Sequence, residues 1–233
     1  MVEIGAGRGA MTSLLAERCR HVAAIELDPQ LVGYLQDRLG ENKRVEILQG
    51  DILNVSLEEL CRRHGVKRAF VFGNLPYYIT SPILHHVLEL EDWLSGMAFV
   101  VQREVAERIA AESGSRAYGY LSVLVQASTI PRIVFSIPPG AFSPPPSVTS
   151  ELVTLEMRTQ HAVRSNCRGV FLRFAKLCFT QKRKTLLNNL LQTYGAGHLR
   201  EAFRRLELSE NTRAEGVTVE SLARLFEALE RLK

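Results

Sequence analysis

The 233-residue sequence lacks any uninterrupted apolar run of roughly 18 residues, the length that a membrane-spanning helix needs, so we expect no membrane span and no membrane partner. It also lacks a basic N-terminal segment followed by an apolar one, which argues against a secretory signal. Its four cysteines include no Cys-x-x-Cys pair, so we expect neither a metal site nor a disulfide framework. These absences predict a cytoplasmic monomer with reduced thiols.

Acidic residues are missing from one long stretch of the chain. Nine basic residues and no Asp or Glu lie between Arg158 and Arg200. Residues 1–157 contain 14 basic and 18 acidic residues, a balance of −4, whereas residues 158–233 contain 15 and 7, a balance of +8. Because soluble helices usually mix both signs on their surfaces, this asymmetry indicates a polyanionic partner for the C-terminal part.

Hydrophobic periodicity predicts alternating strands and helices over the first two thirds of the chain. The predicted strands are His21–Leu27, Val45–Leu48, Ala69–Phe72 and Met97–Val101, and the predicted helices are Ala10–Cys19, Pro29–Leu39, Leu57–His64, Ser81–Leu90 and Glu104–Ala111. Such alternation is typical of an α/β fold, a Rossmann-like doubly wound parallel sheet with helices on both faces. Two more strands, Ile133–Ile137 and Leu152–Met157, bracket a proline-rich loop at residues 138–146.

After Met157 the pattern becomes helical. Apolar residues recur every three or four positions in Arg164–Phe179, Lys182–Leu191, Leu199–Leu206 and Val219–Leu232. Composition and periodicity change together at this point. We therefore predict two domains, residues 1–157 and a small, basic, helical domain at residues 158–233.

A glycine-rich segment, Gly5-Ala6-Gly7-Arg8-Gly9, follows the first apolar residues and precedes a predicted helix. Glycines at such a turn let the backbone approach a ligand closely beside a helix N-terminus. Glu26 ends the next strand, where a carboxylate accepts hydrogen bonds from ribose hydroxyls. The two features predict a nucleoside-bearing cofactor, either a dinucleotide or S-adenosylmethionine.

Two further strand ends favour S-adenosylmethionine. Asp51 ends the third strand, in a position to accept a hydrogen bond from an adenine amine, and Asn74-Leu75-Pro76-Tyr77 ends the fourth. Ligands of doubly wound sheets bind at the carboxyl ends of the strands. A nicotinamide enzyme has no evident use for this tetrad, whereas an enzyme that methylates an exocyclic amine has one.

The tetrad suits the chemistry of an adenine amine, which is a poor nucleophile because its lone pair is delocalised into the ring. The Asn74 amide oxygen and a backbone carbonyl accept hydrogen bonds from the amine and stabilise the charge that develops as the methyl group arrives. Pro76 fixes the direction of the preceding carbonyl, and Tyr77 offers a face on which an extruded base stacks. Asn and Pro are equally common in a turn that merely ends a strand.

Ordered matches along nearly the whole chain carry a family resemblance. They are residues 2–7, 25–28, 73–77, 102–108, 118–123, 142–148, 181–186 and 211–215. With these motifs the sequence resembles the KsgA/RsmA family of ribosomal RNA adenine dimethyltransferases. The resemblance implies transfer of two methyl groups from S-adenosylmethionine to each of two adjacent adenosines near the 3′ end of small-subunit (16S) rRNA, on the immature small ribosomal subunit. It also implies a small helical C-terminal domain.

The resemblance assigns roles to individual residues by position. The cofactor contacts that it implies are Gly5, Gly7, Glu26, Asp51, Ile52 and Asn74. Asn74 would also hold the target amine, Leu75 and Pro76 would complete the catalytic tetrad, and Tyr77 and Phe142 would stack on the flipped adenine, although Phe142 serves equally well as an anchor for the proline loop. The expected RNA contacts are Arg103, Arg108, Lys182, Arg183 and Lys184, any of which is also typical of an ordinary charged surface.

One departure from the family pattern concerns the start of the chain. Members of the family have a further N-terminal segment, with a Gln/Asn-Phe-Leu motif that contributes to the cofactor pocket. Here Met1–Ile4 leaves only about four residues for the first strand, near the short limit for strands. We therefore expect apolar surface beside Val2 and Ile4 to be exposed or abnormally partnered, the loop at residues 5–9 to be mobile and cofactor binding to be weakened.

Two alternatives remain open. A small-subunit assembly factor that binds RNA without methylating it is compatible with the missing N-terminal segment. The related large-subunit rRNA adenine methyltransferases of the macrolide-resistance type share the Asn-x-Pro-Tyr pattern. The matches at residues 181–186 and 211–215 favour the small-subunit type.

Overall fold

The computed structural model describes residues 1–160, 162–163 and 167–230. The chain forms two compact units. The first, here called the N-terminal unit, comprises Met1–Ala106 and Pro131–Met157, and the second, the C-terminal unit, comprises Glu107–Ile130 and Arg158–Lys233. No helix formed by the described residues is long and apolar enough to cross a membrane.

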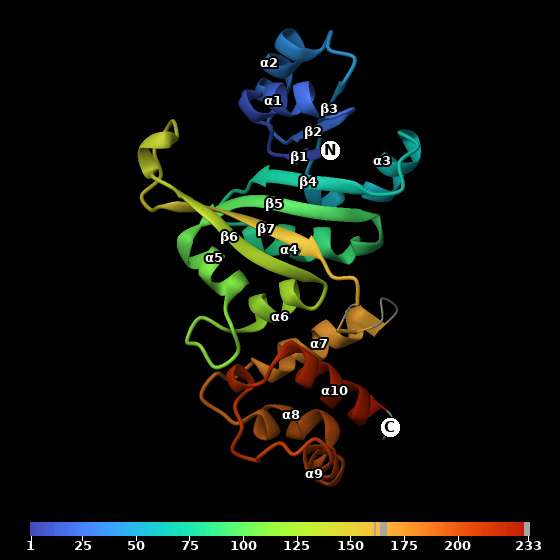
Figure 1. The fold of residues 1–233 in the computed structure, drawn as a ribbon, viewed down its shortest axis with the longest axis vertical. Coiled ribbons are helices and arrows are strands. Elements are labelled where there is room, and N and C mark those ends of the chain that lie inside the picture. Colours follow the sequence, from blue (N-terminus) through green and yellow to red (C-terminus); the bar gives the residue numbers. More distant parts are fainter. Residues whose placement is uncertain (161, 164–166, 231–233) are drawn as a thin grey trace. The chain divides into compact units, whose positions relative to one another are not determined.

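The sheet contains seven strands in the order β3-β2-β1-β4-β5-β7-β6 (Figure 1). Their bounds are β1 Val2–Ile4, β2 Val22–Glu26, β3 Val45–Gln49, β4 Ala69–Asn74, β5 Leu94–Gln102, β6 Thr129–Ile137 and β7 Ser150–Met157. The first five strands pair in parallel, and β7 pairs antiparallel to β5. The predicted α/β class is confirmed, and the late strands join the same sheet rather than a separate one.

A helix follows each of the five parallel strands along the chain. The bounds of these helices are α1 Ala10–Arg18, α2 Pro29–Leu39, α3 Leu57–Arg63, α4 Thr80–Glu89 and α5 Arg103–Ala110. The α2 helix begins where expected because Asp28 caps it, accepting a hydrogen bond from the Gln30 N–H at 2.8 Å, and proline follows at the first helical position. Leu35 of α2 packs on Ala6 and Ala24 beneath it, with Leu39, Val45 and Ile47 around them.

The expectation of exposed apolar surface beside β1 is wrong. Val2 and Ile4 are each only 3% exposed. Although β1 has three residues, it pairs along its whole length with β2 on one side and β4 on the other. A strand in the centre of a parallel sheet is covered on both faces, so its length does not determine its burial.

The C-terminal unit is helical, as predicted, and has an aromatic core. It contains α6 Tyr120–Gln126, α7 Arg168–Cys178, α8 Leu186–Tyr194, α9 Ala196–Arg205 and α10 Val219–Glu230. The rings of Phe171, Phe174 and Phe226 pack together with centroids 5.6–6.3 Å apart, and Tyr194 meets Phe174 edge-on at 6.0 Å. Predicted helical residues 164–166 and 231–232 lie outside the described residues.

Two predictions for this unit differ from the structure. Helix α8 begins at Leu186 rather than Lys182, because the Thr185 hydroxyl accepts the Asn188 N–H and so caps the helix there. Residues Glu107–Ile130, which we expected in the first domain, join the C-terminal unit. The reason lies in their packing: α6 contacts α7, and the buried Arg168 guanidinium donates to the Leu124 carbonyl at 3.4 Å.

Candidate active site

The glycine-rich loop after β1 turns sharply at the carboxyl edge of the sheet. Gly7 and Gly9 have φ of 58° and 76°, a left-handed conformation that glycine adopts at little energetic cost. At Gly9 a Cβ atom would lie 2.7 Å from Leu35 Cδ2, so a side chain there would collide with α2. The loop therefore needs glycine for both its turn and its close packing.

Glu26, at the end of β2, holds this loop in place. One carboxylate oxygen accepts the Gly7 N–H at 2.8 Å, and the other accepts the N–H groups of Leu27 and Asp28 at 2.8 and 3.0 Å. The side chain is 8% exposed. Three backbone donors thus fix a nearly buried carboxylate at the point where we predicted a ribose contact.

A cavity of about 460 Å³ opens beside this carboxylate. Its lining combines backbone of the glycine loop, acidic side chains and apolar walls: Ile4, Gly5, Ile25, Glu26, Leu27, Asp28, Pro29, Gly50, Asp51, Ile52, Pro76, Tyr78, Ile79 and Ile83. The volume and the few polar groups among apolar ones are typical of small-molecule sites. Of the predicted cofactor contacts, Gly5, Glu26, Asp51 and Ile52 line it. Gly7 does not line it but donates its N–H to Glu26, and Asn74 lines a different cavity, described below.

Asp51 stabilises the segment that follows β3. It caps the 3₁₀ helix η1 (Ile52–Asn54), one carboxylate oxygen accepting the Leu53 N–H at 3.0 Å. The carboxylates of Glu26 and Asp51, at the carboxyl ends of β2 and β3, suit the hydroxyl and amine donors of a nucleoside, and Ile52 and Ile79 suit the faces of its base. The acceptor groups and apolar walls of this cavity therefore fit a nucleoside cofactor.

The Asn74-Leu75-Pro76-Tyr77 tetrad lies at the end of β4, and its four side chains have different environments. Asn74 is exposed, whereas Leu75 is 1% exposed and is fixed by its N–H donating to the Val100 carbonyl at 3.0 Å. Leu75 therefore serves the site through its backbone. The Pro76 carbonyl accepts hydrogen bonds from the Ile79 N–H and the Thr80 hydroxyl, which fixes the start of α4.

A second cavity, of about 310 Å³, brings the tetrad and the proline loop together. It is lined by Asn74, Leu75, Pro76, Tyr77, Phe142, Ser143, Pro144 and Pro146. Both aromatic residues are half-buried, and the Tyr77 hydroxyl lies 2.8 Å from Ser150 Oγ of β7. All five predicted catalytic residues therefore meet at one cavity, and Pro76 lines both this cavity and the larger one.

Tyr78, the next residue, is 84% exposed and lines the larger cavity.

Glu3, in the centre of β1, is a residue near the site that the sequence reasoning did not single out. It is 2% exposed. Burial raises the pKa of Glu3 to about 7, and the Glu26 charge adds to the shift. Neither Glu3 Oε2 nor Thr12 Oγ1 has a hydrogen-bond partner among the residues that the structure describes. A charged residue inside an otherwise apolar strand was the available signal.

The predicted RNA contacts divide between the two units. In the N-terminal unit, Arg103 Nε donates to Glu151 at 3.1 Å, so this side chain also has a structural ion pair. In the C-terminal unit, Arg108 lies exposed in the last turn of α5. Lys182, Arg183 and Lys184 lie exposed in the turn between α7 and α8, with Lys182 Nζ donating to the Arg116 carbonyl at 3.4 Å.

The sheet order, the glycine loop held by an acidic residue and the polar tetrad beside a second cavity define a Rossmann-like methyltransferase. Comparison with known proteins then gives the particular family. The model of the family described as "Ribosomal RNA adenine dimethylase" matches residues 1–231, and the chain belongs to this family.

Curated relatives agree with this assignment. Proteins named "Ribosomal RNA small subunit methyltransferase A" from Koribacter versatilis and Acidobacterium capsulatum are 41% and 42% identical to this chain, over 99% of it and over 85% and 81% of their own lengths. The protein of the same name from Staphylococcus aureus is 36% identical, over 97% of this chain and 79% of its own.

Solved structures show the same fold. The 23S rRNA methyltransferase ErmE superposes with a TM-score of 0.74 and 25% identity, over 98% of this chain and 90% of its own. A dimethyladenosine transferase from Plasmodium falciparum gives a TM-score of 0.80 at 20% identity, over 99% and 89%.

Proposed function

We propose that this protein uses S-adenosylmethionine to dimethylate the N6 amines of two adjacent adenosines near the 3′ end of small-subunit rRNA, on the immature small subunit. The observation that carries the proposal is the pair of adjoining cavities that share Pro76, one with nucleoside-binding chemistry and one lined by the Asn-Leu-Pro-Tyr tetrad. The relatives named for the small subunit are 36–42% identical, against 25% for ErmE, which favours a small-subunit substrate.

In the larger cavity, Glu26 and Asp51 would bind the cofactor's ribose hydroxyls and adenine amine, and Ile52 and Ile79 would enclose its base. When bound, S-adenosylmethionine supplies an electrophilic methyl group on a sulfonium. The acidic lining of Glu26, Asp28 and Asp51 favours a cationic ligand.

In the smaller cavity, Tyr77 and Phe142 would hold the target adenine between aromatic faces once it leaves its stack. The Asn74 amide oxygen and the Leu75 carbonyl would accept hydrogen bonds from its amine. These acceptors direct the nitrogen lone pair out of the ring and stabilise the developing positive charge. Catalysis is then mainly positioning for an in-line displacement, without a covalent intermediate on the protein.

Asn74→Ala tests the proposal. Loss of one hydrogen-bond acceptor that acts in the transition state is expected to reduce methyl transfer to small subunits about a hundredfold or more, equivalent to roughly 3 kcal/mol. RNA affinity is expected to stay within twofold, because the amide makes no phosphate contact. Transfer is measured with radiolabelled S-adenosylmethionine.

Asn188→Ala is the matched control, because it removes the same side-chain amide from an exposed position of α8 outside both cavities, and it should retain most of the activity. Full activity in Asn74→Ala would remove the proposed mechanism. A wild-type protein that binds small subunits but transfers no methyl group would support the assembly-factor alternative.

A further inference from the structure

The edge of the sheet opposite the two cavities carries a concentration of basic residues. This amino-terminal edge consists of residues 17–21, 40–46 and 61–68, which precede β2, β3 and β4. Eight of the 14 basic residues in residues 1–157 lie here: Arg18, Arg20, Lys43, Arg44, Arg62, Arg63, Lys67 and Arg68. Three acidic residues, Glu17, Glu41 and Glu46, accompany them.

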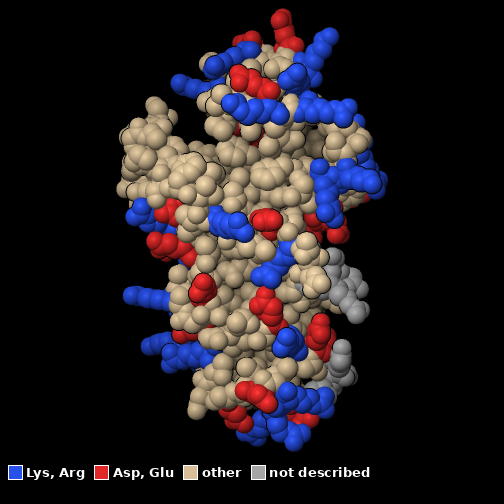
Figure 2. Space-filling view, in the orientation of Figure 1, with Lys and Arg blue, Asp and Glu red and all other residues tan. Residues whose placement is uncertain are grey.

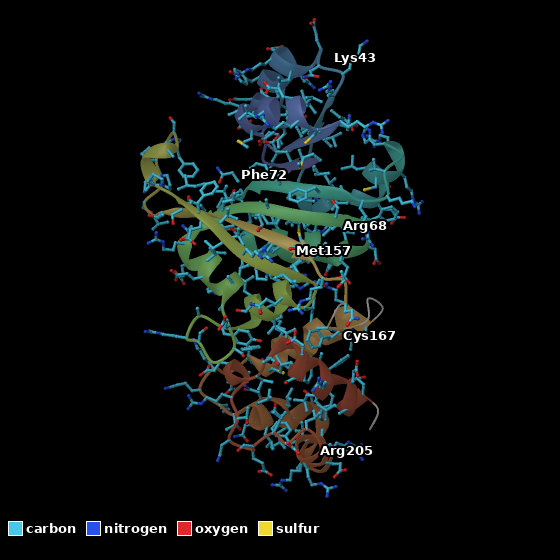
Figure 3. The ribbon with its side chains drawn as sticks, viewed as in Figure 1. Lys43, Arg68, Phe72, Met157, Cys167 and Arg205 are labelled. Atoms are coloured by element: carbon cyan, nitrogen blue, oxygen red, sulfur yellow. The ribbon has the colours of Figure 1, made fainter. Side chains whose placement is uncertain are left out.

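The figures locate this edge within the N-terminal unit. Figure 3 places Lys43 and Arg68 on the right of the unit, whereas Phe72 of β4 lies toward the left, where the strand ends. Figure 2 shows basic side chains gathered along that right-hand side, over α3 and the starts of the strands. The carboxyl edge of the same strands instead carries Asp28 and Asp51 beside the larger cavity.

Helix ends account for part of this charge. Arg18, Arg62 and Arg63 lie in the last turns of α1 and α3, where cations stabilise the helix dipole. Arg44 Nη1 donates to the Ala16 carbonyl at 3.3 Å, near the end of α1. These four cations therefore have a structural explanation.

Four others have no such explanation. Arg20, Lys43, Lys67 and Arg68 lie in loops beyond the helix ends and are exposed. None of them forms an ion pair with any residue in the described part of the chain. Their strands are neighbours in the order β3-β2-β1-β4, so the loops span about 15 Å at the usual strand spacing.

Histidines and one carboxylate lie among these cations. Nitrogen and oxygen atoms of His21, Glu46 and His64 lie within 4.8 Å of one another, an arrangement compatible with a metal ion. Glu46 already binds the Arg63 guanidinium and lies 2.6 Å from His64 Nε2, so its charge is neutralised internally. The surrounding excess of positive charge disfavours a cation and favours an anion.

We infer that the amino-terminal edge is a second rRNA-binding surface, which contacts the phosphates of an RNA segment separate from the one that carries the target adenosines. The inference rests on the proposed function, because its occupant is the substrate rRNA. Exposed Arg and Lys side chains bind a polynucleotide backbone through its phosphates, without base recognition. A protein partner fits less well, because protein interfaces need an apolar centre and the exposed large apolar residue here is Val66.

The test is a quadruple variant, Arg20→Gln, Lys43→Gln, Lys67→Gln and Arg68→Gln, with protein-free small-subunit rRNA as the probe. Binding is measured between 50 and 200 mM salt, a range in which about four phosphate contacts give a strong dependence. We expect the log–log salt slope to fall by about two to three units and affinity at low salt to fall at least tenfold. Affinity for S-adenosylmethionine, measured by calorimetry, is expected to stay unchanged and reports on the fold.

The matched control exchanges the basic residues at the same positions, as Arg20→Lys, Lys43→Arg, Lys67→Arg and Arg68→Lys, and should bind rRNA like wild type. An unchanged salt slope in the glutamine variant overturns the inference. The inference is also overturned if the glutamine variant binds intact small subunits more weakly than wild type but binds free rRNA equally well. That result would mean that the edge contacts a ribosomal protein. A different result separates this inference from the proposed function. If the salt slope of wild type exceeds that of the glutamine variant but wild type transfers no methyl group, the RNA-binding surface is supported and the proposed function is contradicted.

Discussion

Two buried glutamates in the N-terminal unit differ in the hydrogen bonds that their carboxyl groups accept. Glu26 receives three backbone N–H groups, which stabilise a negative charge at the mouth of the larger cavity. Glu3, one strand away and 2% exposed, has an oxygen without a hydrogen-bond partner in the described residues. Backbone donors hold the Glu26 carboxylate beside the larger cavity, whereas burial raises the pKa of Glu3 to about 7.

The raised pKa of Glu3 predicts that the stability of the protein depends on pH. Because burial raises the pKa of Glu3 to about 7 from its usual 4.5, the folded protein binds this proton more tightly than the unfolded chain does. The free energy of unfolding should therefore fall as pH rises from about 4.5 to 7 and level off above that, by on the order of 2–3 kcal/mol. In Glu3→Gln this contribution is absent.

Urea denaturation of both proteins at pH 5 and pH 8 measures the difference. Wild type is expected to lose about 2 kcal/mol more than Glu3→Gln between these pH values. Equal losses would show that Glu3 ionises normally in the folded protein.

At the scale of single elements, the strands and helices of the N-terminal unit could be predicted because their apolar runs are short and separated by turn residues. Helix α6 could not. Its Leu121, Val123, Leu124 and Val125 are all buried, and a segment that is apolar on every side has no periodicity to distinguish a helix from a strand. The antiparallel pairing of β7 also depends on long-range packing, which local patterns do not encode.

That the candidate-site residues lie at one edge of the sheet could be predicted, for a physical reason. Its residues stand at strand ends, and the carboxyl ends of parallel strands necessarily meet at one edge. The joining of Phe142 to the tetrad followed from the resemblance rather than from any local pattern. Three features depend on side-chain packing and could be seen only in the structure. They are the separation into two adjoining cavities, the burial of the Leu75 side chain and the burial of the Glu3 carboxyl group.

The turn between α7 and α8 gives a prediction at this scale. Lys182, Arg183 and Lys184 are exposed there, just before the Thr185 cap. Changing all three to Gln should weaken rRNA binding and reduce the log–log salt slope by about two to three units, because each phosphate contact releases roughly one counterion. Filter binding across a salt series measures the slope.

The fold and cofactor affinity of this triple variant should match wild type, since the side chains lie outside both cavities. If the salt slope does not change, the three cations are ordinary solvated surface and the C-terminal unit binds RNA elsewhere.

Over the whole molecule, the distribution of charge agrees with the proposed binding of RNA and of a cationic cofactor at different surfaces. Residues 158–233 carry a balance of +8, from 15 basic and 7 acidic residues. Residues 1–157 carry −4 overall but gather eight of their cations at the amino-terminal edge, away from the acidic lining of the larger cavity. Cations on both units would hold a large RNA, while the acidic lining favours a cationic cofactor.

The central claim is that this protein dimethylates small-subunit adenosines. It is tested most directly by incubating unmethylated small and large ribosomal subunits separately with the protein and S-adenosylmethionine, then mapping modified nucleosides in each rRNA by mass spectrometry. We predict N6,N6-dimethyladenosine at two adjacent positions near the 3′ end of the small-subunit rRNA and none in the large-subunit rRNA. Dimethyladenosine in the large-subunit rRNA alone, or in neither, would contradict the account.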